Sequence, residues 1–206
     1  MSEALKVLLL SLGAYLFGAI PFGLFIGKKI KGVDVRNFGS GNIGATNVVR
    51  VIGRKWGILV FTLDFFKGFA PVCVTFIVMR SDPDLLRLAC LIVTLAAIAG
   101  HNWPVYLKFK GGKGVSTTIG CAAALSIFLP VLRMPLLGAL LVWVITYKLS
   151  KLVGLASLLM AFAFLLVCFL APGTGWEFKT LALFIALFIT IRHRQNIKDI
   201  RTRFKR

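Results

Sequence analysis

The fold of this chain is limited above all by the alternation of long apolar segments with short connectors rich in lysine and arginine. Hydrophobic residues make up 58% of the 206 positions, and 25 Lys and Arg residues stand against only 7 Asp and Glu. A soluble domain of this length would be far less apolar. The alternation is typical of an integral membrane protein whose cationic connectors gather on one side of the bilayer. We therefore expect a single membrane-embedded, all-α domain over residues 1–206.

Seven apolar segments predict seven transmembrane helices. They cover approximately residues 4–27, 56–79, 88–103, 115–132, 135–148, 152–171 and 178–191. The run from 115 to 148 is too long for one helix, and Pro130 and Pro135 divide it, since proline ends or kinks a helix. The first segment is long for the core of a signal peptide and lacks a clear cleavage site, so we expect a membrane helix there.

The charges of the connectors predict which side of the membrane each one faces. In chain order the net charges are +6 (28–55), 0 (80–87), +3 (104–114), +1 (130–135), +2 (148–151), 0 (172–179) and +6 (192–206). Every odd-numbered connector is more basic than its neighbours, and lysine and arginine are enriched on the cytoplasmic side of membrane proteins. The N-terminus is then expected outside and the C-terminus in the cytoplasm.

The amide and imidazole side chains predict a functional site on the cytoplasmic face. All five Asn, both His and the single Gln lie within or beside three cytoplasmic connectors, at 36–50, 100–114 and 192–198. Residues kept only for solubility would be scattered over both faces. Their gathering on one face therefore indicates a binding site there.

The second of these connectors has the residues of a phosphate site. Its glycines allow a tight turn that points successive N–H groups at one spot, and its lysines surround that spot with positive charge. The hydroxyl residues that follow open a new helix, whose first N–H groups also point outward. The residues concerned are Gly111, Gly112, Gly114, Lys108, Lys110, Lys113, Ser116, Thr117 and Thr118. The alternative is a solvated basic turn, because the spacing of a Walker A loop is absent.

The first connector contains a second candidate anion site. If residues 44–52 form a helix, Thr46 and Arg50 share one face at i, i+4, with Asn47 beside them. The guanidinium of Arg50 can hold a phosphate with two N–H groups, which a lysine cannot do. A flexible glycine-rich turn with one basic residue is the alternative. The remaining polar candidates in this connector are Ser40 and Asn42.

Further candidates lie next to the apolar segments. His193 and Asn196, at i, i+3, can face one pocket, although the arginines around them also suit an anchor to anionic lipid. His101 and Asn102 directly precede the glycine-rich turn, and His101 is either a catalyst or a structural hydrogen-bonding group. Ser157, near the cytoplasmic end of the sixth segment, leaves room for a ligand or a backbone to approach.

Asp64 and Lys67 place opposite charges inside the second apolar segment. An ion pair within the membrane is costly, so it is either a structural clip between helices or a direct part of a catalytic site. No metal site is expected, because carboxylates are few and each of the four cysteines lies alone in an apolar run.

Three stretches of the sequence together carry a family resemblance. They are Gly-Ser-Gly-Asn-Ile-Gly-Ala-Thr-Asn-Val-Val-Arg (39–50), Gly-His-Asn-Trp-Pro-Val-Tyr-Leu-Lys-Phe-Lys-Gly-Gly-Lys-Gly-Val (100–115) and His-Arg-Gln-Asn-Ile-Lys (193–198). In this order, and between apolar segments of suitable length, they resemble the three cytoplasmic motifs of the bacterial acyl-phosphate-dependent glycerol-3-phosphate acyltransferases. Ser116 departs from the motif, where a small residue such as Ala is expected.

The resemblance implies a seven-helix plasma-membrane enzyme that makes lysophosphatidic acid from acyl phosphate and sn-glycerol 3-phosphate and releases phosphate. It implies no cofactor, no metal and no nucleic-acid partner, with anionic lipid around the basic connectors. The residues carried over to glycerol 3-phosphate are Ser40, Arg50 and Lys113. Those carried over to the acyl phosphate or the transition state are Asn42, Thr46, His193, Asn196 and the backbone of Gly111, Gly112 and Gly114, and the division between the two groups stays open. The wider binding set adds Asn47, His101, Asn102 and Ser157, and the expected catalytic group is His193, Asn196, Ser40, Thr46 and Lys113.

A different class of protein also fits a basic, one-sided membrane site. An organophosphate carrier, or a membrane protein that binds phospholipid precursors, would need similar phosphate contacts. Carriers commonly have inverted repeats and a site near the middle of the membrane. This sequence has no evident repeat, and its polar groups gather at one surface, which favours the enzyme.

Overall fold

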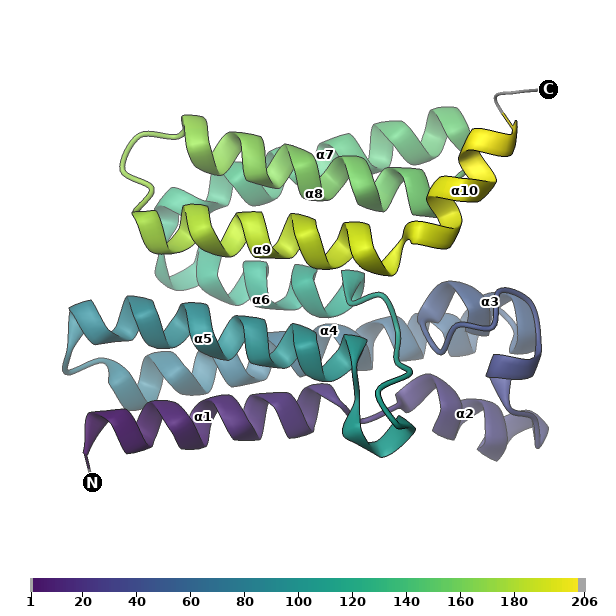
Figure 1. Cartoon of the computed structure of the whole chain (residues 1–206), viewed down its shortest axis with the longest axis horizontal. Helices are drawn as coiled ribbons and strands as arrows, with labels where there is room; N and C mark the ends of the chain where they lie inside the picture. The colour runs from purple at the N-terminus through teal and green to yellow at the C-terminus, as the bar shows by residue number, and fades with distance from the viewer. Residues whose placement is uncertain (1, 204–206) are drawn as a thin grey trace. The chain divides into compact units, whose positions relative to one another are not determined.

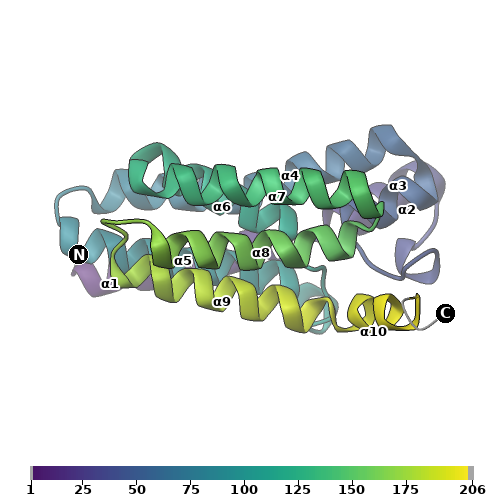
Figure 2. The same cartoon turned by 90° about the horizontal axis from the view of Figure 1, so that it is seen from above.

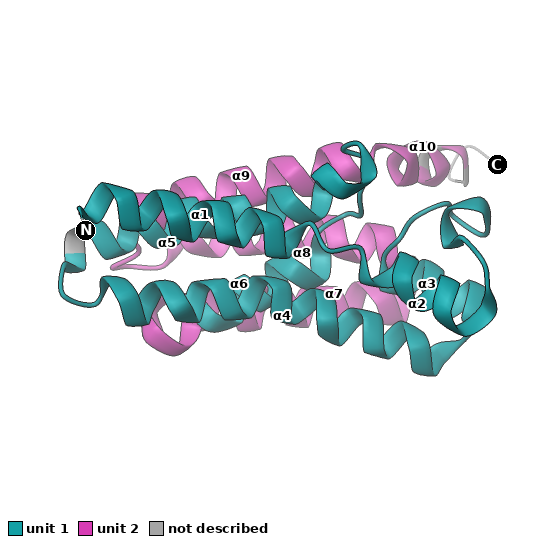
Figure 3. Cartoon of the chain, turned by 90° about the horizontal axis from the view of Figure 1, so that it is seen from below, with its two compact units in different colours: residues 1–124 teal, residues 125–206 magenta. Residues whose placement is uncertain are grey.

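Within the residues that the computed structural model describes, 2–203 without the side chains of residues 84, 201 and 203, every regular element is a helix. This confirms the all-α class expected from the sequence. The chain forms two compact units, residues 1–124 and 125–206, which Figure 3 distinguishes by colour. Helix α6 (Val115–Phe128) crosses the boundary between them.

Unit 1 is built on three long helices, α1 (Glu3–Gly18), α4 (Arg54–Met79) and α5 (Pro83–Asn102). Helix α1 packs along α4 and α5, and α4 and α5 pack on each other (Figure 1). Helix α5 begins as an Asp-Pro pair predicts, because the side chain of Asp82 accepts the N–H of Leu85 and proline is tolerated in the first turn. The shorter elements of the unit are α2 (Phe22–Lys31), η1 (Val35–Asn37), α3 (Ala45–Ile52) and η2 (Val105–Leu107).

The first apolar segment is two helices rather than the single helix expected over residues 4–27. Helix α1 ends at Gly18 and α2 begins at Phe22. Pro21 causes the break, because it has no N–H to donate and it disfavours the helical conformation of the preceding Ile20. The break redirects the chain, so that α2 packs against α3 and the first part of α4.

Glycines allow close helix contacts in unit 1, as small residues commonly do between membrane helices. A Cβ at Gly18 would collide with the carbonyl oxygen of Ala97, and one at Gly100 with the carbonyl oxygen of Tyr15. Helices α1 and α5 therefore approach backbone to backbone near the end of α5. This contact fixes the point from which the second glycine-rich connector departs.

Unit 2 contains the end of α6, η3 (Pro130–Leu132), α7 (Arg133–Ser150), α8 (Val153–Leu170), α9 (Trp176–Arg192) and α10 (Arg194–Arg203). Helix α8 packs between α7 and α9, and α10 leaves the end of α9 to contact α8 (Figure 2). The predicted break near Pro130 is confirmed. The helix that follows it begins at Arg133 and extends to Ser150, so it is longer than the predicted 135–148.

Five segments of the described chain are long and apolar enough to cross a membrane. They are Glu3–Lys31, Arg54–Met79, Leu85–Leu107, Pro130–Ser150 and Val153–Leu170, with Val115–Phe128 as a shorter apolar helix. The side chains of Leu137, Leu141 and Leu149 along α7 are 60%, 61% and 82% exposed, as expected for a surface that faces lipid. The count of seven spans and the orientation of the termini stay predictions.

Candidate functional site

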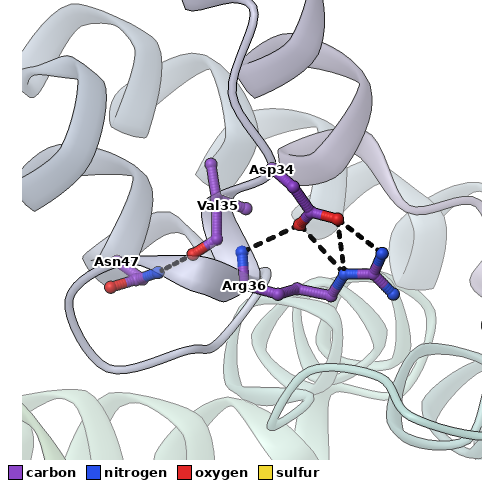
Figure 4. A network of polar contacts seen from close by, with 4 residues as sticks. All are labelled: Asp34, Val35, Arg36 and Asn47. Carbon is purple, nitrogen blue, oxygen red and sulfur yellow. Dashed lines mark hydrogen bonds and ion pairs between the residues drawn. The ribbon is translucent and has the colours of Figure 1, made fainter.

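The first glycine-rich loop, residues 36–44, is held from within by the buried side chain of Asn47 (Figure 4). Gly39, at φ 59°, passes so close to Oδ1 of Asn47 that a Cβ there would collide with it. The sequence predicts Asn47 as a ligand-binding residue, whereas in the structure its amide is occupied by the loop backbone. Its four hydrogen bonds, at 2.7–3.1 Å, are donated to the carbonyl oxygens of Val35, Phe38 and Asn42 and accepted from the N–H of Ser40.

A charged clip closes the entry to the same loop. Oδ1 of Asp34 accepts the N–H of Arg36 at 2.9 Å, and Oδ2 lies 2.5 Å from Nη2 of Arg36 (Figure 4). The hydrogen bond from the Arg36 side chain lowers the pKa of Asp34 from 3.8 to about 2. Because this pKa is depressed in the folded chain, the clip stabilises the fold fully above pH 3.8 and is lost as the pH falls through about 2.

Helix α3 confirms the helical register on which the pairing of Thr46 and Arg50 depends. Both residues are exposed on one face of the helix, while Val48 is buried on the other. Ser40 is exposed on the loop that leads into α3, and Asn42 is half-buried. Oδ1 of Asn42 accepts the N–H of Gly44 at 2.8 Å, which turns the chain into the helix. The loop and α3 thus present two hydroxyl groups and a guanidinium outward, those of Ser40, Thr46 and Arg50.

The second glycine-rich loop, residues 103–114, follows directly from α5. The hydroxyl of Tyr15 donates to the carbonyl oxygen of Trp103 at 2.8 Å and so fastens the start of the loop to α1. Lys108 and Phe109 have φ values of 50° and 62°. This left-handed conformation costs a residue with a side chain roughly 1–2 kcal/mol. These two strained residues reverse the direction of the chain after η2.

The glycines of this loop are needed for close packing against the end of α5. The N–H of Gly112 donates to the carbonyl oxygen of His101 at 3.0 Å. A Cβ at Gly112 would collide with Nε2 of the same histidine, and a Cβ at Gly111 with its carbonyl oxygen. His101 is itself buried, at 4% exposure. The imidazole therefore packs against the glycine-rich turn and supports it. Of the two roles that the sequence left open for His101, catalyst or structural group, this contact favours the structural one.

Asn102 has an unusual environment next to the start of α6. Its side chain is fully buried, and among the described residues neither its Oδ1 nor its Nδ2 has a hydrogen-bond partner. A Cβ at Gly114, the residue before α6, would lie 2.6 Å from Oδ1 of Asn102. A buried amide without partners is costly, so this side chain is unusual for a folded protein.

The helix expected after the glycines is confirmed. Helix α6 begins at Val115, and its first turn closes with the N–H of Thr118 donated to the carbonyl oxygen of Gly114 at 2.8 Å. The N–H groups that precede this bond point out of the helix end toward the glycine-rich turn. Lys113 is half-buried at the same place, whereas Lys108 and Lys110 are exposed.

The two glycine-rich loops of unit 1 pack against the same cluster of buried apolar side chains, which we call the apolar floor. Val35, Ile43, Val48 and Val60 form a buried cluster under the first loop and α3. Leu107 of the second loop packs against the same cluster. The candidate residues of connectors 36–50 and 100–114 therefore belong to one part of the fold.

The remaining candidates lie in unit 2. His193 is 2% exposed at the break between α9 and α10, with its Nδ1 2.8 Å from the carbonyl oxygen of Ile189. Asn196, in the first turn of α10, lies against Gly154 of α8, where a Cβ would be 2.6 Å from its Nδ2. Ser157 is buried and donates to the carbonyl oxygen of Val153 at 2.9 Å.

Two hydrogen bonds, one in each unit, come from side chains that the sequence did not single out. Nε1 of Trp143 donates to Oγ of Ser157 at 3.3 Å, and Tyr15 holds Trp103 as described above. Both are large side chains with one polar atom inside apolar segments, and such atoms usually find a partner when buried. That rule could have selected them as supporting residues, but their partners depend on the fold. Among residues 2–203, no three His, Cys, Asp or Glu side chains gather as a metal site would require.

The chain is similar to proteins of one family over nearly its whole length. The family model described as "Glycerol-3-phosphate acyltransferase" matches residues 8–203. The glycerol-3-phosphate acyltransferase of Aquifex aeolicus (strain VF5) is 41% identical over 198 residues, which cover 96% of this chain and 97% of that protein. The one of Desulforamulus reducens is 39% identical over 193 residues, which cover 94% and 90%.

Solved structures give the same result. The crystal structure of PlsY (YgiH), an integral membrane glycerol 3-phosphate acyltransferase, in its glycerol 3-phosphate form superposes with a TM-score of 0.84 at 41% identity, over 96% of this chain and 92% of that one. Its lysophosphatidic acid form gives 0.81 at 39% identity, with the same coverage. The chain, an integral membrane protein, therefore belongs to the glycerol-3-phosphate acyltransferase family.

Proposed function

We propose that this protein transfers an acyl group from an acyl phosphate to the 1-hydroxyl of sn-glycerol 3-phosphate, giving lysophosphatidic acid and inorganic phosphate. Membership of the family supports the acceptor and the reaction type. Structures of a relative named for its glycerol 3-phosphate and lysophosphatidic acid forms support this acceptor and this product. The acyl phosphate donor follows from the resemblance of the three connectors and from two glycine-rich loops that suit phosphate groups.

The chemistry needs no covalent intermediate on the protein. An acyl phosphate is a mixed anhydride, so its carbonyl carbon is already activated. The 1-hydroxyl oxygen of glycerol 3-phosphate attacks that carbon, the new C–O ester bond forms, and the C–O bond to phosphate breaks with its electron pair leaving on the phosphate. The hydroxyl proton leaves to the departing phosphate or to solvent. The protein acts by positioning the two substrates and by stabilising the charge that develops on oxygen.

Ser40, Arg50 and Lys113 are our candidates for binding glycerol 3-phosphate. Ser40 and Arg50 are exposed on the first loop and α3, and Lys113 is half-buried at the start of α6. A fork of two N–H groups from Arg50 and a point charge from Lys113 suit different oxygens of one phosphate. The shared apolar floor of the two loops supports their acting on one ligand.

The acyl phosphate, or the transition state, is assigned to the backbone N–H groups of Gly111–Gly114 and to Thr46, Asn42, His193 and Asn196. The amide of Asn102 joins this group, because it is fully buried and unpaired beside Gly114 among the described residues. Ser157 completes the proposed binding set. His101 and Asn47 act indirectly, since each is buried against the loop that it supports.

The proposed setting is a bacterial plasma membrane crossed by seven helices, with the site on its cytoplasmic side. The basic connectors support this orientation through the enrichment of lysine and arginine in the cytoplasm. The acyl chain of the donor would lie between helices, open to the bilayer. The basic helix α10 would contact anionic lipid headgroups.

One observation carries the proposal: two glycine-rich loops, each supported by a buried polar side chain, pack on one apolar cluster, and the second loop contains the half-buried Lys113. The test is the donor requirement of the purified protein in detergent. Acyl phosphate should give lysophosphatidic acid and inorganic phosphate in equal amounts, and acyl-coenzyme A should not replace it. Equal turnover with acyl-coenzyme A, or product without release of phosphate, would contradict the proposed donor.

A further inference from the structure

Two buried charges on α4 take no part in the chemistry proposed above. Nζ of Lys67 lies 3.0 Å from Oδ1 of Asp64, and the two side chains are 1% and 4% exposed. The ion pair expected from the sequence is therefore formed inside the helical core of unit 1. A buried pair is seldom more stabilising than apolar side chains of the same size. Its contacts with other elements indicate what it does.

Asp64 connects α4 to both ends of the second glycine-rich loop. Its carboxylate Oδ1 lies 3.8 Å from Nδ1 of His101, the histidine whose ring and carbonyl oxygen support Gly112. Its backbone carbonyl oxygen accepts the hydroxyl of Thr117, in the first turn of α6, at 3.0 Å. One turn further along α4, Gly68 lets the carbonyl oxygen of Thr117 approach closely. Through these contacts, Asp64 helps to fix the positions of both the glycine-rich turn and the start of α6.

Lys67 connects the same pair to the first glycine-rich loop. Its Nζ donates to the carbonyl oxygen of Ile20 at 2.7 Å, at the break between α1 and α2, and lies 5.3 Å from the centre of the Phe22 ring. Helix α2 then passes so close to the first loop that a Cβ at Gly23 would collide with the carbonyl oxygen of Ile43. The ammonium group therefore fixes the break from which α2 is directed onto that loop.

We propose that Asp64 and Lys67 are positioning residues that set the two glycine-rich loops in register for phosphate binding. The inference rests on the proposed function, because it assigns the loops to phosphate groups. Asp64 contacts the elements on both sides of the second loop, and Lys67 contacts the break that leads through α2 to the first loop. A pair that only joined α4 to its neighbours would not need contacts on the histidine under Gly112 and on the break before α2.

The pair is tested by replacing it with apolar residues of similar size, Asp64→Leu/Lys67→Met, in the purified full-length protein in detergent. The double variant leaves no unpaired charge in the core, so the fold should be retained. The matched control is Thr75→Val, which removes a fully buried hydroxyl of the same helix that donates to the carbonyl oxygen of Pro71, four residues earlier on α4. Thermal unfolding, steady-state kinetics and amide hydrogen exchange are measured for both variants.

We expect the double variant to unfold at a temperature close to that of Thr75→Val. Its KM for glycerol 3-phosphate should rise about tenfold or more with little change in kcat, since binding of the phosphate is the same in the ground and transition states. Amides of residues 103–118 should exchange about tenfold faster than in the control, while those of α1 and α4 do not. The local change in exchange, together with the KM effect, separates positioning from general support of the fold.

Exchange and KM equal to those of Thr75→Val would overturn the inference. So would faster exchange throughout α1, α4 and α5, because the pair would then hold the helices rather than the loops. If the wild-type protein itself gives no lysophosphatidic acid, the proposed function fails. The exchange measurement still decides in that case whether the pair holds the glycine-rich turn.

Discussion

At the scale of single residues, the candidate site depends on buried polar side chains that support exposed ones. Asn47 is the clearest example, since one amide makes four hydrogen bonds to the backbone of the first loop. Replacing it leaves several backbone groups without partners, at about 1–3 kcal/mol for each that stays buried. A residue of this kind controls the position of ligand groups without touching the ligand.

We therefore expect Asn47→Leu to lower the unfolding temperature and to raise KM for glycerol 3-phosphate, because the first loop loses its internal fastening. Thermal unfolding in detergent and initial rates measure the two effects. Asn37→Ala is the control, since Asn37 is an exposed asparagine within the same loop. Equal behaviour of the two variants would show that the amide of Asn47 does not hold the loop.

Lys113 and Arg50 are expected to act directly on phosphate. A charge-assisted contact contributes about 1.5–3 kcal/mol, so Lys113→Ala should reduce kcat/KM for glycerol 3-phosphate by about ten- to a hundred-fold while the protein still folds. Arg50→Lys should also be impaired, because a point charge cannot replace a planar fork of N–H groups. Lys29→Ala removes one charge from an exposed position on α2 and serves as the control. Identical kinetics for Lys113→Ala and Lys29→Ala would rule out Lys113 as a phosphate ligand.

The residue types of the site could be predicted from the sequence, but the tasks of several could not. Glycine, lysine and a helix start at 111–118 indicate an anion site through local chemistry alone. That Gly112 is required by the ring of His101 depends on how the loop folds back onto α5. The inward orientation of Asn47 likewise depends on the tertiary path of the first loop. Local pattern therefore identifies the site, and packing decides which residues support it.

At the scale of elements, the second glycine-rich loop combines required and strained positions. Lys108 ends η2 in the left-handed conformation, with φ 50° and ψ 44°. Lys110, two residues further along, does not have a positive φ. Both lysines are exposed, so they differ mainly in backbone conformation.

Lys108→Gly should therefore stabilise the protein by about 0.5–1 kcal/mol, since glycine adopts the left-handed region freely. Lys110→Gly should destabilise it slightly, because glycine there only adds freedom to the unfolded chain. Thermal unfolding of the two variants in the same detergent provides the comparison. A decrease in stability for both would mean that Lys108 is not strained in solution.

The element boundaries show how far local rules reach. Proline predicted the break after α6, although α6 ends at Phe128 and not at the predicted residue 132. The hydroxyl residues 116–118 predicted a helix start, which the structure has at Val115. The break at Pro21 follows the same rule, yet the apolar run around it is long enough to suggest one uninterrupted span. The length of an apolar run indicates whether a segment can span a membrane, but it does not show whether the helix is broken within that segment.

At the scale of the whole molecule, the connector charges predict an external N-terminus and a cytoplasmic C-terminus. Single cysteines introduced at Ser2 and Thr202 should react with a membrane-impermeant reagent from opposite sides of intact vesicles. The native cysteines interfere little, because Cys90, Cys121 and Cys168 are buried and only Cys73 is half-buried. Labelling of both introduced positions from one side would contradict the seven-span arrangement.

The distinction between an enzyme and a carrier also belongs to the whole molecule. A carrier moves its ligand between two compartments and leaves it chemically unchanged. In detergent, where no sealed compartment exists, a carrier therefore gives no product at all. An acyltransferase forms a new ester bond wherever both substrates reach its site.

The most direct measurement is thin-layer analysis of radiolabelled glycerol 3-phosphate incubated with acyl phosphate and the purified protein in detergent micelles. We predict that the label moves into lysophosphatidic acid at a rate proportional to protein, and that omission of acyl phosphate abolishes the product. Label that stays entirely in glycerol 3-phosphate, with folded protein and both substrates present, would contradict the proposed enzyme.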